Sequence, residues 1–502
     1  MKETVEITRR TFTSQLAATG LLFTLPSQTQ SLISTDAPAV PIQPSGITYL
    51  LGYGSRITPS LVVKRVPGRQ GGKKFWVEGW NDPQQSFEWT VSAKRSGRYE
   101  VTLMVSAPAG TVLTIQGPHS RLQCTTTEPG KGQYNWDRIT LPSALIVPKG
   151  TSTIRIQLAQ SLAAPSVGAA FKSAELLDVR ERPAMDARIR AFRSDASWLG
   201  AAKFGVMCQC GEWSYPAHGP HKPWPQMVDQ FDVEKFADMV ESTGAGYAIW
   251  SATWATYYFP APIKAIDRLL PGRTSTRDLI ADLAAALAKR DIRLMLYYHL
   301  GAEGPPASDT GPIDNPLTLS QQPSYFDNWC AVLQEVGERY GDRLAGWMFD
   351  DELIYYPAPY EQLGKAAKAG SKSRIISYNP WIQARGTDFQ DFQFGEGFTG
   401  STELPASAKG IWPSGPFKGL QAQGCFQVDA PDWGVNHSET VIRAPHFTRE
   451  RGIQMALEAA ERNEALSWNL LMYDDGSVSP ESLEVLRAAG AAVRERYAKA
   501  GV

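Results

Sequence analysis

Acidic side chains follow apolar segments at several points in the second half of this 502-residue chain. Asp350 and Asp351 come directly after the apolar run 344–349, and Glu396 stands between two glycines after the segment 389–394. Two carboxyl groups, one ionised and one protonated, can break an acetal: one attacks the anomeric carbon and the other protonates the leaving oxygen. The residue types therefore indicate chemistry on a glycosidic bond.

Polar and aromatic side chains follow the other apolar segments in the same way. The candidates for contact with a substrate are Gln209, Trp254, His299, Asn379, Trp381 and Asp429. Amides, imidazoles and carboxylates bond to hydroxyl groups, and indole rings pack against apolar faces of a ligand. For each of these residues, core packing or the anchoring of a loop is the alternative interpretation.

Other catalytic chemistries find little support in the sequence. The six histidines are scattered, and Cys208 and Cys210 form an isolated C-x-C pair, whereas a zinc site needs clustered ligands. No G-x-S-x-G elbow and no phosphate-binding loop occurs. The run Asp474-Asp475-Gly476 is typical of a turn that needs no calcium. We therefore expect neither a metal ion nor an organic cofactor.

The overall charge limits the classes of partner. Fifty lysines and arginines against 51 acidic residues give a formal net charge of −1, so no global field favours nucleic acid or an anionic membrane. Five cysteines do not make a disulfide framework in a chain of this length. We expect an oligosaccharide or polysaccharide as the partner, with no nucleic acid and no membrane span.

The elements that must position these residues alternate between strands and helices over residues 198–502. Eight apolar segments are predicted as strands, at 203–210, 246–252, 293–299, 344–350, 374–378, 389–394, 419–428 and 465–473. Helical spacing follows most of them, at 233–242, 276–290, 325–340, 360–369, 449–463 and 479–497. This order predicts a (β/α)8 TIM-type barrel, whose chemistry lies at the carboxyl ends of its strands. A doubly wound open sheet is the alternative, but no glycine-rich fingerprint follows any strand.

A β-rich module precedes the barrel, at residues 46–179. Short segments with period-2 alternation, such as 87–91, 97–105 and 151–158, are separated by turn residues. They predict a β-sandwich of jelly-roll-like type, and two of its patterns resemble carbohydrate-binding modules.

Two features of this module and its exit allow more than one interpretation. Four tryptophans could form platforms for sugar rings, although a tryptophan in a sandwich more often belongs to the core; they are Trp76, Trp80, Trp89 and Trp136. The charged segment 180–197 contains Pro183, and we expect it to be a plain connection to the barrel.

The first 39 residues have the pattern of an export signal. Arg9 and Arg10 precede Phe12, the apolar run 16–25 follows, and Ala37-Pro38-Ala39 supplies a cleavage site of small residues. The paired arginines indicate the twin-arginine type, which exports folded proteins. A membrane anchor is the alternative, although this run has about half the length that a bilayer span needs. We expect a periplasmic or secreted protein.

Several motifs of the barrel region resemble one known family. They are Lys203-Phe204-Gly205-Val206, Arg277-Asp278-Leu279-Ile280, Trp347-Met348-Phe349-Asp350 and Asn469-Leu470-Leu471. In this order they resemble segments of the α-L-fucosidases, glycoside hydrolase family 29. The resemblance implies that Asp350 is a nucleophile, that a covalent glycosyl-enzyme forms, and that the product retains the anomeric configuration. Asp351 is the alternative nucleophile, and capping of a helix or pairing with an arginine is the structural alternative.

The acid/base partner is predicted from its position. Retention requires roughly 5 Å between the two carboxyl groups, and Glu396 lies at the end of a strand two places further round the barrel. Gly395 precedes it and leaves its backbone free to adapt. Asp429 and Glu303 are the alternatives.

The chain departs from this family at positions that contact the sugar. Gln209 stands where the family has a histidine on its first strand, and Thr253-Trp254-Ala255 stands where it has a pair of histidines. Because imidazoles are lost from the pocket, the resemblance implies the scaffold but a sugar other than L-fucose. We therefore expect an exported, retaining and exo-acting glycosidase. The alternatives are a glycan-binding protein on the same barrel and a lyase or transferase.

Overall fold

The computed structural model describes residues 38–57, 64–66, 76–126, 136–162, 168–254, 257–299, 325–381, 383–396, 404–429, 433–443 and 445–498. The paired arginines and apolar run of the expected export signal, together with Glu303 and Ala255, lie outside the described residues. Ala39–Val502 forms one compact unit, and Met1–Pro38 is assigned to another. None of the described helices is long and apolar enough to cross a membrane.

Two β-sheets form the module that precedes the barrel. The first has the order β1-β6-β12-β8-β9 with β3 beside β6, and the second has the order β10-β7-β13-β5-β4 with β2 beside β13 and β11 beside β7. Neighbouring strands are antiparallel, except that β1 and β6 are parallel. The strands are β1 (Val40–Pro41), β2 (Ile47–Leu51), β3 (Arg56–Ile57), β4 (Lys64–Val66), β5 (Trp76–Trp80), β6 (Ser86–Ala93), β7 (Gly97–Ser106), β8 (Val112–Gln116), β9 (Arg121–Thr125), β10 (Trp136–Thr140), β11 (Leu145–Val147), β12 (Gly150–Leu158) and β13 (Ala169–Asp178).

Apolar side chains from both sheets make the core of this module. Phe87 on β6 and Phe171 on β13 stack with their ring centroids 4.8 Å apart, and Trp80 packs edge-on against both rings. Burial of such large rings between two sheets supplies the hydrophobic free energy that holds a sandwich together. The predicted β-sandwich ahead of the barrel is confirmed.

The four tryptophans of the sandwich are buried, with no more than 6% of any of them exposed. Nε1 of Trp80 donates to the carbonyl of Gln85 at 3.2 Å, and Nε1 of Trp89 donates to the carbonyl of Leu51 at 3.0 Å. The other two, on β5 and β10, pack edge-to-face with 5.9 Å between their centroids. All four therefore pack inside the molecule, and none forms an exposed platform for a sugar.

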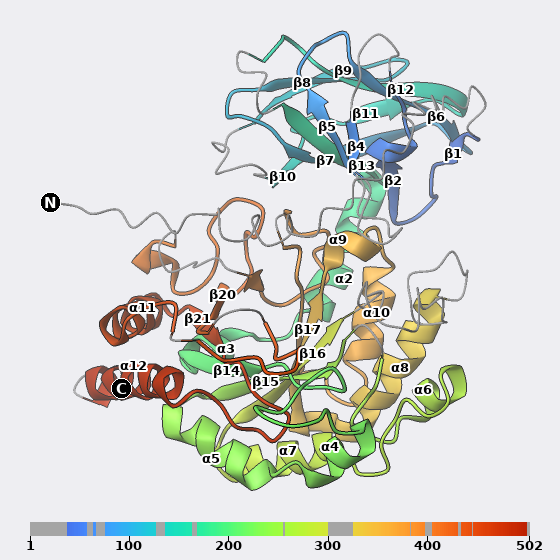
Figure 1. The fold of residues 1–502 in the computed structure, drawn as a ribbon. Coiled ribbons are helices and arrows are strands. Elements are labelled where there is room, and N and C mark those ends of the chain that lie inside the picture. The colour runs from blue at the N-terminus through green and yellow to red at the C-terminus, as the bar shows by residue number, and fades with distance from the viewer. Residues whose placement is uncertain are drawn as a thin grey trace, which may run out of the picture. The chain divides into compact units, whose positions relative to one another are not determined.

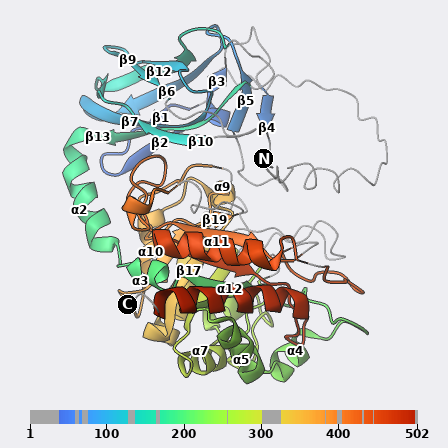
Figure 2. The same cartoon turned by 90° about the vertical axis from the view of Figure 1, so that its left-hand side faces the viewer.

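Two elements of this region differ from what the sequence patterns predict. All ten residues of β13 are buried, so this strand lacks the alternation that marks a half-exposed one. The helix α2 (Arg182–Phe192) occupies the segment expected to be a plain connection, and Figure 2 shows it leading to α3 (Ser197–Ala201). Pro183 lies in the first turn of α2, where proline is compatible with a helix because its missing N–H would have no partner there.

Eight parallel strands form the barrel sheet, in the order β18-β17-β16-β15-β14-β21-β20-β19. They are β14 (Phe204–Cys208), β15 (Tyr247–Thr253), β16 (Arg293–His299), β17 (Leu344–Asp350), β18 (Ile375–Tyr378), β19 (Gly395–Glu396), β20 (Gln423–Gln427) and β21 (Ala465–Asn469). The helices of this region, drawn around the strands in Figure 1, are α4 (Trp224–Gln230), α5 (Val233–Thr243), α6 (Lys264–Leu269), α7 (Leu279–Ala288), α8 (Tyr325–Tyr340), α9 (Glu352–Tyr355), α10 (Tyr360–Ala367), α11 (Arg449–Arg462) and α12 (Pro480–Ala498). The predicted (β/α)8 TIM-type barrel is confirmed.

Carboxylates at helix N-termini determine where two of these helices begin. Asp232 accepts a hydrogen bond from the N–H of Lys235 at the start of α5, and Asp278 accepts one from the N–H of Ala281 at the start of α7. Asp278 also accepts from the hydroxyl of Tyr340 at 2.8 Å, which ties the start of α7 to the end of α8. The caps therefore fix the outer layer against the strands.

The sixth strand is shorter than the sequence predicts and begins later. The alternation of 389–394 predicts this strand, but the ladder with β20 contains only Gly395 and Glu396. Within the expected segment, the Asp391 carboxylate accepts from the backbone N–H of Ile376 at 2.8 Å and pairs with Lys368 at 2.9 Å. A side chain thus takes the place of a backbone partner, and in the described part of the chain no ladder joins β18 to β19.

Candidate active site

Asp350 is the last residue of β17, and hydrogen bonds hold both of its carboxylate oxygens. The Tyr297 hydroxyl donates to Oδ2 at 2.5 Å, and Nδ2 of Asn379 donates to Oδ1 at 2.7 Å. The backbone N–H of Asp351 donates to the same Oδ1 at 2.8 Å. Tyr297 lies on β16 and Asn379 follows β18, the two strands that flank β17, so the parallel register brings their side chains to one end of the sheet.

Asn379 joins Asp350 to the second candidate carboxylate. Its Nδ2 atom donates both to Oδ1 of Asp350 and to Oε2 of Glu396, each at 2.7 Å. The two acceptor oxygens therefore lie no more than twice that distance, 5.4 Å, from each other. Carboxyl groups are about 5–5.5 Å apart in glycosidases that retain configuration and about 6.5–9.5 Å apart in those that invert it. The spacing is that of the retaining geometry.

The backbone around Asn379 fixes the orientation of its amide. Its N–H donates to the carbonyl of Phe349 at 2.7 Å, and its carbonyl accepts from the N–H of Glu352 at 2.8 Å. Its side-chain oxygen accepts from the N–H of Trp381 at 3.0 Å. Because the side-chain oxygen is already bonded to a donor, the amide nitrogen is the atom that faces the two carboxylates.

Tyr297 belongs to the site although the sequence patterns do not assign it there. Burial raises the pKa of Tyr297 well above its usual value, and the neighbouring Asp350 carboxylate adds to the rise. The hydroxyl therefore keeps its proton and remains a donor to Asp350. Tyr297 precedes His299 by two residues on a strand, so both side chains lie on the same face. Counting back by two from His299 would have found it.

His299 and two tryptophans line the same end of the barrel. Nε2 of His299 lies 3.3 Å from Oδ2 of Asp351 and 3.9 Å from Oδ2 of Asp350. Trp254 packs edge-on against the His299 ring, with 6.2 Å between centroids, and Trp213 lies 5.7 Å from Trp254. This row of rings extends from Asp350 across the ends of β16, β15 and β14, where a sugar ring can pack against it.

Two residues beside the carboxylates have a backbone conformation that is unfavourable for side-chain-bearing residues. Asp351 has a φ of 53° and Trp381 a φ of 52°. The left-handed region costs about 1–2 kcal/mol for such a residue, and residues of this kind cluster at functional sites. Trp381 is also 37% exposed, so its indole is accessible to a ligand.

Two expected contact residues are more enclosed. Gln209, after β14, is 8% exposed. Asp429, after β20, is fully buried and accepts hydrogen bonds from the N–H of Leu471 at 2.9 Å and from the Ser482 hydroxyl. These contacts anchor the chain that leaves β21 and the start of α12. We therefore give Asp429 a structural position in place of the substrate contact or acid/base role expected for it.

Glu212 is a further carboxyl group near this row of rings. It follows β14 directly before Trp213, and its Oε2 atom is buried with no hydrogen-bond partner among the described residues. Burial raises the pKa of Glu212 to about 8, although the charge of Arg273 acts in the opposite direction. The carboxyl group is therefore mostly protonated at neutral pH. No pattern in the sequence distinguishes such a glutamate from an exposed one.

The cysteines and acidic residues offer little to a metal ion. Across the described ranges, no three histidine, cysteine, aspartate or glutamate side chains are grouped closely enough to hold one. Burial raises the pKa of Cys210 to about 12 and raises that of Cys208 as well, so both remain thiols, which bind metals poorly. Asp474 lies 3.4 Å from Nζ of Lys222 and is thus paired with a protein cation.

Fold and site together define a class: a (β/α)8 barrel with paired carboxylates and aromatic rings at the carboxyl ends of its strands. No protein-family model and no curated protein sequence matches the chain. Among solved structures, the α-L-fucosidase AlfC from Lactobacillus casei in complex with its α-L-fucose product is 16% identical, covers 60% of this chain and 98% of its own, and has a TM-score of 0.42.

Two other solved structures are similar to the same extent. A bacterial fucosidase with a monovalent iminocyclitol inhibitor is 16% identical, with 61% of this chain and 76% of its own covered and a TM-score of 0.44. The endo-fucoidan hydrolase MfFcnA4 from glycoside hydrolase family 107 is 14% identical, with 60% of this chain and 54% of its own covered and a TM-score of 0.44. These are likenesses in the path of the chain.

Proposed function

We propose that this protein is a glycoside hydrolase that cleaves an oligosaccharide or polysaccharide with retention of configuration. The observation that carries the proposal is the single amide nitrogen of Asn379, which bonds both Asp350 and Glu396. It places two carboxyl groups at the separation that a double displacement requires. The resemblance of the segment 347–350 to the fourth-strand motif of the α-L-fucosidases supports the same pairing.

Asp350 is the nucleophile of the proposed reaction. One of its oxygens attacks the anomeric carbon while the bond from that carbon to the leaving oxygen breaks, and a glycosyl ester forms. Tyr297, Asn379 and the N–H of Asp351 donate to the carboxylate and fix the directions of its remaining lone pairs. The attack therefore needs no reorientation of the side chain.

Glu396 is the acid/base. In the first step it protonates the leaving oxygen, and in the second it accepts a proton from the water that hydrolyses the ester. Asn379 contacts both carboxyl groups, so its two N–H groups can balance negative charge as the charge leaves Asp350 in the first step and returns in the second.

Specificity belongs to the aromatic side of the site. Trp254, His299 and Trp381 offer faces and edges on which a sugar can pack. Gln209 and Trp254 stand where the resembling family has histidines, so we propose a sugar other than L-fucose. Export by the N-terminal segment and action on a terminal sugar complete the proposal, and both rest on the sequence alone.

Hydrolysis of a panel of aryl glycosides and oligosaccharides tests the proposal. We expect turnover of at least one sugar by the wild type and a loss of about 10³-fold or more in kcat for Asp350→Asn, because the covalent step is removed. Asp475→Asn is the matched control, since Asp475 is an exposed aspartate that follows β21. Activity that survives Asp350→Asn but is lost in Asp351→Asn would move the role to Asp351.

Substitution of the second carboxyl group has a different expected result. Glu396→Gln should slow the hydrolysis of substrates with poor leaving groups by about 10²–10⁴-fold and spare those whose leaving group needs no proton. Equal losses for both kinds of leaving group would contradict the role of Glu396. If no sugar is turned over while glycan binding is measurable, the chain is instead a binding protein on this barrel.

A further inference from the structure

The loop that follows Asp350 is bonded to the β-sandwich. Tyr356, at the end of α9, is buried, and its hydroxyl lies 2.7 Å from the hydroxyl of Ser173 and donates to Oε1 of Glu175 at 3.1 Å. Both partners lie on β13, the central strand of the second sheet. The Tyr356 ring also packs edge-on against Tyr49 of β2, with 5.6 Å between centroids. The segment that leaves the nucleophile is thus held on two strands of the sandwich.

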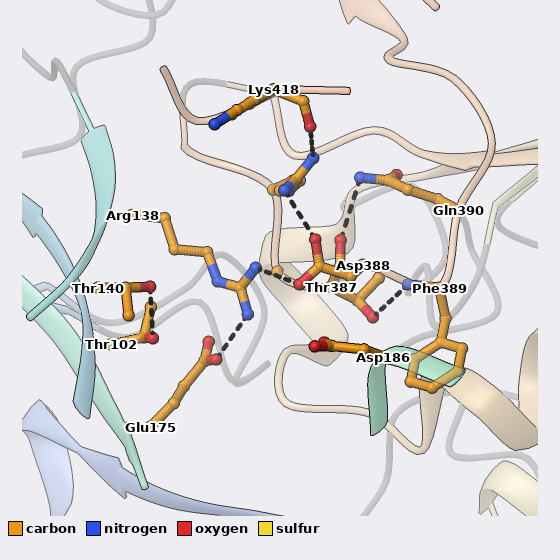
Figure 3. A network of polar contacts seen from close by, with 12 residues as sticks. Thr102, Arg138, Thr140, Glu175, Asp186, Thr387, Asp388, Phe389, Gln390 and Lys418 are labelled. Carbon is orange, nitrogen blue, oxygen red and sulfur yellow. Dashed lines mark hydrogen bonds and ion pairs between the residues drawn. The ribbon is translucent and has the colours of Figure 1, made fainter. Parts of the chain in front are cut away.

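The same glutamate belongs to an ion network that reaches a second loop of the barrel. Arg138 on β10 pairs with Oε2 of Glu175 at 2.7 Å and with Oδ2 of Asp388 at 3.1 Å, as Figure 3 shows. Asp388 also pairs with Arg385 at 2.7 Å. The side chain of Arg138 is only 11% exposed, so these pairs are screened little by solvent. Arg138 and Arg385 hold the pKa of Asp388 below its usual range in spite of burial.

These two anchored loops are the ones that carry the site. The first runs from Asp350 to Tyr356, and the second leads from Asn379 to Asp388. Between the anchors they are bonded to each other: the N–H of Glu352 donates to the Asn379 carbonyl at 2.8 Å, and the buried Glu352 carboxylate accepts from the N–H of Gly386 at 3.1 Å. The spacing of Asp350 and Glu396 depends on Asn379, which lies inside this bonded pair of loops.

We infer that the β-sandwich is part of the catalytic apparatus, with Tyr356 and Arg138 as positioning residues that fix Asp350 and Asn379 through these two loops. Neither residue touches the reacting atoms. Each holds a loop against a sheet whose strands are rigidly paired, so the carboxylates stay at the separation that the proposed reaction needs. The inference rests on the proposed hydrolase function for its kinetic consequence and on the hydrogen bonds alone for its structural one.

Two variants separate this role from general stabilisation. Tyr356→Phe removes the hydroxyl and its two bonds but keeps the ring, and Arg138→Met removes the bridge between Glu175 and Asp388. Arg56→Met is the matched control, because Arg56 pairs with the buried Glu88 in the first sheet and is itself 64% exposed. We expect Tyr356→Phe to lower kcat about tenfold with KM unchanged within twofold, and Arg56→Met to leave both unchanged.

Hydrogen–deuterium exchange provides a readout that needs no substrate. In the full-length protein, amides of 350–356 and 383–390 should exchange at least tenfold faster in Tyr356→Phe than in the wild type or in Arg56→Met, while those of β12 stay unchanged. If Arg138→Met does not fold, Tyr356→Phe still decides the matter. Tyr356→Phe combined with Glu175→Gln should slow kcat no more than the worse single variant, because both break one contact.

The outcomes distinguish the two proposals. Unchanged exchange in these loops overturns the inference whatever the activity. Faster exchange with wild-type kcat also overturns it, because the loops would then be held without consequence for the reaction. Faster exchange in a protein whose wild type hydrolyses no glycoside rejects the proposed function and leaves the positioning of the two loops by the sandwich standing.

Discussion

At the scale of single residues, the site depends on the amide of Asn379. Its nitrogen serves two carboxylates at 2.7 Å each, while its side-chain oxygen and both backbone groups are bonded elsewhere. An amide with all its bonds assigned cannot rotate without losing several of them at once. It therefore acts as a fixed spacer between Asp350 and Glu396.

Asn379→Asp tests this spacer. The substitution replaces a donor to two carboxylates with a third carboxylate, so repulsion separates the pair at neutral pH. We expect kcat to fall by about 10²-fold or more and the optimum of the pH–rate profile to move to lower pH, where the introduced carboxyl group is protonated and can again donate one bond. An unchanged pH optimum measured on the same substrate would contradict this role.

Glu212 gives a prediction about stability and pH. Burial raises its pKa from 4.5 to about 8, so folding favours the protonated form, and stability present at low pH is lost as the pH rises through this interval. Glu212→Gln removes that dependence. The Tm of the variant relative to the wild type should therefore rise by several degrees between pH 5 and pH 8.5. Parallel Tm curves for the two proteins would show that Glu212 is ionised in the fold; Glu439→Gln, at an exposed position, serves as the control.

The sequence predicts individual site residues well where they directly follow a strand. Asp350, Asn379 and His299 can be found because an apolar run ends at or before each of them, and the structure brings them together. Tyr297 lies within its strand, where aromatic residues usually belong to the core. Asp429 also follows a strand, and only its tertiary partners show that it is enclosed.

At the scale of elements, the patterns succeed where one periodicity dominates. α8, β16 and β17 begin and end at the residues predicted, because α8 has a continuous apolar face and the two strands are short apolar runs with clear ends. The alternation of 389–394 predicts a strand, but the Asp391 side chain takes a backbone N–H there. A substitution of that kind is set by tertiary contacts, so no local pattern records it.

The contact between the two site loops yields a prediction at this scale. A methyl group on Gly386 would lie 2.5 Å from Oε1 of Glu352 and 2.8 Å from the Tyr356 ring. Gly386→Ala should therefore displace Glu352, lower the Tm by several degrees and reduce kcat at least tenfold. Gly54→Ala is the control, since a methyl group there meets nothing within 4 Å. Equal Tm and kcat for the two variants would mean that the loops are not packed as described.

At the scale of the whole molecule, the sandwich and the barrel share one apolar cluster. It includes Met104 and Leu177 from the second sheet together with Met185 of α2 and Phe389 of the barrel. The sequence predicts both parts, but its patterns indicate a plain connection between them and give no sign of the buried ions that join them. Contacts between distant segments leave no periodicity, so they could not be predicted from the chain.

This continuity predicts how the protein unfolds. Because the shared cluster and the Arg138 network are lost together, calorimetry of the full-length chain should show a single cooperative transition for the sandwich and the barrel. Glu175→Gln should lower the Tm of that transition as a whole. Two resolved transitions, of which only one responds to Glu175→Gln, would contradict a shared structural unit.

The stereochemistry of hydrolysis tests the paired carboxylates most directly. Proton NMR can follow the anomer that forms first from the substrate identified in the panel, before mutarotation. Oxygens of Asp350 and Glu396 no more than 5.4 Å apart predict a first product with the anomeric configuration of the substrate. A first product of inverted configuration would contradict the double displacement and the assignment of Asp350 as its nucleophile.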